Sequence, residues 1–148
     1  MAAQWPLIVA RLLVLLPTLP GWSDVAVIDG LPLTADIPTD AVTVGYVTDD
    51  NAGAYTTIQD DSGFQWQEMG TVRGELSCVT GDTDLASMRT RMFGLIGAFQ
   101  DSIRADRTLG GVLSPTGTVD LQVDVRSVQD VSGTEQSAVF TLTYFTIT

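Results

Sequence analysis

Residues 71–103 decide the fold, because their apolar spacing changes from every second residue to every third or fourth: TVRGELSCVTGDTDLASMRTRMFGLIGAFQDSI. The first part predicts a strand, with one face formed by Val72, Gly74, Leu76 and Cys78 and the other by Arg73, Glu75 and Ser77. The second part predicts a helix of roughly 22 residues, judged from its apolar period. Its apolar face holds Leu85, Met88, Met92, Leu95 or Ile96, Phe99 and Ile103.

Two glycines, Gly94 and Gly97, lie inside this predicted helix. Each glycine costs a helix roughly 1 kcal/mol relative to alanine. A helix that tolerates two of them usually has a close neighbour on that side. We therefore expect the sheet or another helix to pack closely against Gly94 and Gly97.

Strand and turn signals divide the rest of the chain. Further strands are expected at residues 24–28, 41–48, 64–68, 119–126 and 137–147, with 71–79 as a separate strand. The acidic, polar stretch 49–63 is expected to be a loop region. The pattern predicts the α+β class, with an antiparallel or mixed β-sheet flanked by an N-terminal helix and one long central helix. Residues 1–148 are expected to form one domain.

The apolar run Leu7–Leu16 resembles a secretory signal only superficially. Such a signal needs a positively charged start and an uninterrupted apolar stretch, whereas here no charged side chain precedes the run and Arg11 interrupts it. The run is also too short to span a bilayer. We expect a helix over Gln4–Leu16, with Pro6 in its first turn and Pro17 ending it. Its broad apolar coverage predicts burial on most sides, within the fold or against a partner.

The charged residues exclude several classes of function. The 148-residue chain has 18 acids and seven bases, a formal charge of −11, one cysteine and no histidine, and all seven bases are arginines. Catalysis by a histidine base or a lysine nucleophile is therefore excluded, and so is a Walker-A loop. A net charge of this sign also disfavours binding to nucleic acid and to anionic lipid.

No motif indicates a catalytic, cofactor-binding or metal-binding residue. Cys78 lies on the apolar face of its strand, where an unpaired cysteine acts as a small buried hydrophobe. The pairs Asp49–Asp50 and Asp60–Asp61 lack the spacing of a calcium loop. We predict a protein that is not an enzyme and that needs no cofactor or metal.

Five features follow one another over most of the chain. An apolar N-terminal helix precedes VAVIDGLP at 25–32, VTVGY at 42–46, QEMGTVRGELSC at 67–78 and, after the long helix, DRTLGGV at 106–112. In their order and spacing they resemble the tail terminator proteins of long, non-contractile tailed bacteriophages, which are also called minor tail or tail-completion proteins. Two terminal strands complete the resemblance.

The resemblance implies a structural virion protein at the head–tail junction, assembled in the host cytoplasm. Tail terminators form a hexameric ring that caps the tail tube, stops its polymerisation and offers a joining surface for the head. The implied partners are further copies of the chain, the tail tube protein and a head-completion or connector protein, with no membrane. The residues expected at interfaces are Glu68, Met69, Gly70, Arg73, Arg126 and Asp130.

The net negative charge of the chain would affect the channel of such a ring. Six copies of a chain with charge −11 carry a formal charge of −66 around a channel that genomic DNA must pass. A channel of like sign repels phosphates and avoids specific binding. The candidate channel-lining acids are Asp49, Asp50, Asp60 and Asp61.

Two alternatives remain open from the sequence. One is another virion part, a tail tube subunit or a head–tail connector, and filaments of the purified protein would favour the tube subunit. The other is a secreted or envelope-associated binding domain, which the apolar N-terminal run suggests. Cleavage near Ser23, detected by N-terminal sequencing, would favour this second alternative.

Overall fold

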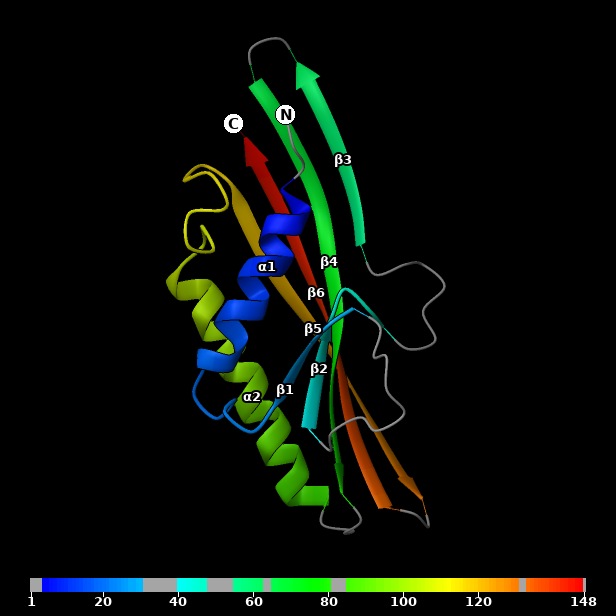
Figure 1. The fold of residues 1–148 in the computed structure, drawn as a ribbon. Coiled ribbons are helices and arrows are strands. Elements are labelled where there is room, and N and C mark those ends of the chain that lie inside the picture. The colour runs from blue at the N-terminus through cyan, green and yellow to red at the C-terminus, as the bar shows by residue number, and fades with distance from the viewer. Residues whose placement is uncertain are drawn as a thin grey trace.

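Two helices lie on one face of a single mixed β-sheet (Figure 1). The computed structural model describes residues 4–30, 40–47, 55–62, 65–80, 85–130 and 133–147. The helices are α1 (Trp5–Leu15), a following 3₁₀ turn η1 (Leu16–Thr18) and α2 (Leu85–Ala105). The strands are β1 (Ala26–Asp29), β2 (Asp40–Val44), β3 (Tyr55–Ser62), β4 (Gln65–Thr80), β5 (Thr118–Asp130) and β6 (Gly133–Ile147).

Strand β4 is the centre of the sheet. The strand order is β1-β2-β4-β6-β5, and β3 also pairs with β4. Because β6 pairs with residues 67–80 of β4, strands β3 and β2 share the opposite edge, at residues 65–72 and 74–78. Strands β1 and β2 are parallel, and the other described pairs are antiparallel. The predicted α+β class, with a mixed sheet, an N-terminal helix and one long central helix, is confirmed.

The sheet contains more strand than the sequence predicted. Residues 55–62, expected to be loop, form β3 and pair with β4 along their whole length. The two strands expected at 64–68 and 71–79 are one strand, β4, which continues through Gly70. Thr56, Thr57 and Ile58 favour a strand, and pairing with β4 extends it over the two aspartates that follow. Residues 48–54, which include the expected turn after β2, lie outside the described part.

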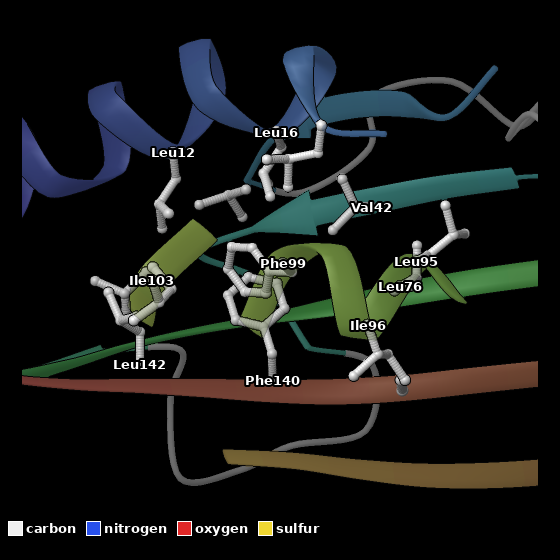
Figure 2. Close-up of a cluster of buried hydrophobic side chains, with 14 of the residues drawn as sticks. Leu12, Leu16, Val42, Leu76, Leu95, Ile96, Phe99, Ile103, Phe140 and Leu142 are labelled. Atoms are coloured by element: carbon white, nitrogen blue, oxygen red, sulfur yellow. The ribbon is translucent and has the colours of Figure 1, made fainter. Parts of the chain in front are cut away.

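The core lies between the helices and the sheet (Figure 2). The rings of Phe99 on α2 and Phe140 on β6 meet edge to face, with centroids 5.4 Å apart. Trp22 packs beside Phe99, and its indole nitrogen donates a 3.0 Å hydrogen bond to the carbonyl oxygen of Leu95. Such aromatic contacts fix the position of α2 over the sheet because they combine burial with a preferred ring geometry.

Gly74 brings β4 close to its neighbours in this core. A Cβ atom there would collide with the backbone carbonyl oxygen of Thr43 on β2 and with the ring of Phe140. The missing side chain therefore lets Phe140 lie across β4, and this close approach requires glycine.

Helix α1 is covered on one face. Its predicted position is confirmed, with Pro6 in the first turn and Pro17 in the turn that follows. The residues that pack into the core are Ile8, Val9, Leu12 and Leu16. Among the residues that the structure describes, α1 is not buried on most sides as expected, because Leu7 and Val14 are more than half exposed.

Candidate interface surfaces

Glu68 is a buried carboxylate beneath the start of α1. It lies on the helix-covered face of β4 and is fully buried. Its Oε1 and Oε2 atoms accept hydrogen bonds from the backbone N–H of Gln4 at 3.1 and 2.9 Å. The Tyr144 hydroxyl donates to Oε2 at 2.9 Å. Gln4 makes no side-chain cap of its own, so a carboxylate from the sheet satisfies the positive end of α1.

Two of the candidate interface residues, Glu68 and Gly70, are therefore not exposed at the surface of the subunit. Both residues face the helices and are buried within the chain. The alternation along the strand predicts their burial, because Glu68 and Gly70 have the same parity as Val72 on the apolar face. The alternation predicted for residues 71–79 extends back along β4 to Glu68 because the strand continues through Gly70.

Met69 lies on the opposite face of β4, which we call the open face because neither helix covers it. Its side chain is 53% exposed and stands beside Phe145, its cross-strand partner on β6. Phe145 and Ile147, two residues further along β6, are half-buried. We call Met69, Phe145 and Ile147 the Met69 patch.

The other candidate interface residues are spread along the open face and its far end. Arg73 on β4 is half-buried and lies opposite Thr141 of β6. Arg126 is exposed on β5. Asp130 ends β5, and its backbone pairs with Gly133. Met69, Arg73 and Arg126 therefore share one face, although Arg126 lies several residue pairs away from Met69.

Part of the open face is already covered. Ala41, Thr43 and Val139 point to this side, and all three are buried. Thr43 donates its hydroxyl hydrogen to the carbonyl oxygen of Tyr46 at 2.8 Å. The accessible region of the open face therefore comprises the end that carries Met69 and the exposed side chains of β5.

The candidate channel-lining acids are placed only in part. Asp49 and Asp50 lie outside the described residues. Asp60 and Asp61 are in β3, where their backbones pair with Gln67 and Trp66 of β4. These two acids thus lie near the end of the β3–β4 ladder, at the top of Figure 1.

Charge is divided between the two layers. The two helices together contain four arginines and one aspartate, whereas the six strands contain ten acids and two arginines. On the open face, Asp120 and Asp124 of β5 are exposed. The helical layer is therefore net positive and the sheet net negative, a difference that the total charge of −11 conceals.

A groove runs along the outer side of α2, where Gly94 and Gly97 form its floor. Within the described part of the chain, nothing lies within 4 Å of a Cβ built at either glycine. Two adjoining hollows of about 620 and 570 Å³ share Pro20 and Gly94 as lining residues. The predicted close packing against these glycines is therefore wrong as far as the described residues are concerned. We call this feature the α2 groove; its walls include Leu19, Pro20, Phe93 and Leu95.

Cys78 has the environment of an inert thiol. It is buried, as predicted, and burial together with the neighbouring Asp40 carboxylate raises its pKa to about 12. That carboxylate accepts a 2.8 Å hydrogen bond from Nε of Arg91 on α2. Among the described residues, no three histidine, cysteine, aspartate or glutamate side chains gather in a group that would hold a metal ion.

Comparisons with known proteins add no relative. No protein-family model matches the chain, and no curated protein matches it either. The likeness to tail terminators therefore rests on the order and spacing of the sequence segments. In the described part of the chain, neither helix has the length and apolarity needed to cross a membrane.

Proposed function

We propose that the chain is a structural virion protein that forms a hexameric ring on the end of a phage tail tube. The observation that supports this proposal best is the presence of two different accessible surfaces, the Met69 patch and the α2 groove, on opposite sides of a two-layer domain. A subunit with two unlike contact surfaces joins its copies head to tail. Such contacts form a ring when the rotation between subunits closes.

The ring would stop polymerisation of the tail tube and present a joining surface to a head-completion or connector protein. Met69, Arg73, Arg126 and Asp130 are the proposed interface residues, and Glu68 and Gly70 support them from within the subunit. Genomic DNA would pass through the channel without specific binding. The proposed lining acids, Asp49, Asp50, Asp60 and Asp61, would repel its phosphates.

Electron microscopy and native mass spectrometry of the purified protein test the ring. We expect closed rings with a mass near 95 kDa, six times the 15.8 kDa chain. Adding these rings to tail tube protein during polymerisation should shorten the tubes. Filaments of the protein alone would instead identify a tube subunit, and a monomer at all concentrations would contradict the proposal.

The channel charge has its own test. In a density map of the ring, the ends of β3 with Asp60 and Asp61 should face the lumen. A ring that places these acids on its outer rim and arginines inside would refute the acidic channel while leaving the capping function standing.

A further inference from the structure

The α2 groove lacks an occupant within the described chain. Its walls are mainly apolar, with Thr90, Arg91 and Asp101 among the polar lining residues, and its glycine floor keeps open a space that alanine or leucine would fill. Two glycines weaken the helix, and no described residue packs against them in return. This arrangement is favourable when a side chain from outside the subunit enters the groove.

The exposed large apolar side chains limit the choice of occupant. In the described part of the chain these are Leu7, Val14, Met69 and Phe93. Phe93 lines the groove itself, and Leu7 and Val14 belong to the same helical layer. Met69 alone among them stands on the open face, beside Phe145.

Charge favours Met69 over the two residues of α1. Inserting Leu7 or Val14 of a second copy into the groove would bring together two helical layers that are both net positive. The open face instead presents the exposed carboxylates of Asp120 and Asp124, whereas α2 presents the exposed Arg89. Arg104 lies 3.5 Å from the carboxylate of Asp101 on the same helix, which lines the groove. Opposite charges around an apolar contact favour this pairing and fix its orientation.

We propose that the Met69 patch of one copy docks in the α2 groove of the next copy. Helix α2 lies on one face of the sheet (Figure 1), and Met69 lies on the other face, so a chain cannot place its own Met69 patch in its own groove. Each copy that donates its patch keeps a groove for another copy, as a ring requires. The contact thus deepens the proposed function and, as a ring contact, rests on it.

Pairwise cysteine cross-linking tests which surface enters the groove. Chains carrying Met69→Cys are mixed with chains carrying Gly94→Cys or Gly97→Cys and then oxidised. We expect a disulfide-linked dimer in at least one of these mixtures and in none of the three variants when each is oxidised alone. The native Cys78 is buried and does not contribute. The matched control mixes Val14→Cys chains with the same two groove variants and should give no link.

The outcomes separate this inference from the ring function. A link from Val14→Cys and none from Met69→Cys overturns the Met69 contact, even if rings are seen. Rings without a link from either donor overturn it as well. A Met69→Cys link in a protein that forms open chains supports the contact and contradicts the hexameric ring.

Filling the groove gives a second readout. Gly97→Leu should reduce association of the copies at least tenfold, measured by analytical ultracentrifugation. The substitution adds atoms where no described neighbour lies and replaces a poor helix former, so the Tm should not fall. Gln100→Leu, which places the same side chain on α2 outside the groove lining and changes no charge, should associate like the parent protein. Equal association of Gly97→Leu and the parent would overturn the proposal.

Discussion

The two faces of β4 differ in burial, although their residues alternate along one strand. On the covered face Val72, Leu76 and Cys78 are buried under the helices. On the open face Met69 is more than half exposed, and Arg73 is half-buried. The covered face therefore determines how the chain folds, and the open face is available for partners. Substitutions one residue apart should separate these two roles.

The largest difference is expected between two neighbours on β6. Phe140→Ala should lower the free energy of unfolding by about 3–5 kcal/mol, because it removes a ring packed against Phe99 and leaves a cavity. Thr141→Ala, on the open face, should change it by no more than about 0.5 kcal/mol. Urea denaturation of both variants measures the difference. Equal losses would mean that the open face also belongs to the core.

Gly74 and Gly97 offer a comparison between two glycines. Gly74→Ala should destabilise by about 1–3 kcal/mol, because its Cβ would collide with the carbonyl oxygen of Thr43 and the ring of Phe140. Gly97→Ala should instead stabilise α2 by up to about 1 kcal/mol, since its Cβ would meet open space. Thermal and urea denaturation measure whether each substitution lowers or raises the stability. A destabilising Gly97→Ala would show that the groove is filled within the chain.

Glu68 tests the polar part of the covered face. Glu68→Ala should cost about 1–3 kcal/mol, because the Tyr144 hydroxyl and the Gln4 N–H both lose their acceptor. Glu68→Gln keeps an acceptor and should cost less. Limited proteolysis should cut near α1 faster in Glu68→Ala than in the parent. A variant with unchanged stability and cleavage would show that Glu68 does not hold α1 to the sheet.

The sequence predicted the parts of the fold that follow one period over many residues. The alternation from Val72 to Cys78 and the helical spacing of α2 are both confirmed. Strand β3 was missed, because its acids favour a loop locally and only its pairing with β4 specifies a strand. Pairing partners distant in the chain leave no local signal.

The site residues show the same limit. Met69 and Arg73 were expected at an interface; Met69 is exposed and Arg73 half-buried on the open face, so this prediction is open to test. Glu68 was expected at an interface as part of the segment 68–73 that the resemblance suggested, although its parity with Val72 places it under α1. The sequence also marked Gly94 and Gly97 as a packing position, but it could not show that no described residue of the subunit packs there.

Cys78 gives the smallest expected effect and the only one that depends on pH. Its pKa is about 12 in the folded chain and near 9 when exposed, so unfolding favours loss of the thiol proton as the pH rises above 9. Stability from this group is therefore complete below pH 9 and declines towards pH 12. At pH 10 the loss should be about 1 kcal/mol. Cys78→Ala, which lacks this thiol, is the control. The parent protein should lose more stability than this variant between pH 8 and pH 10, and an equal loss would show that the thiol is not shielded by the covered face.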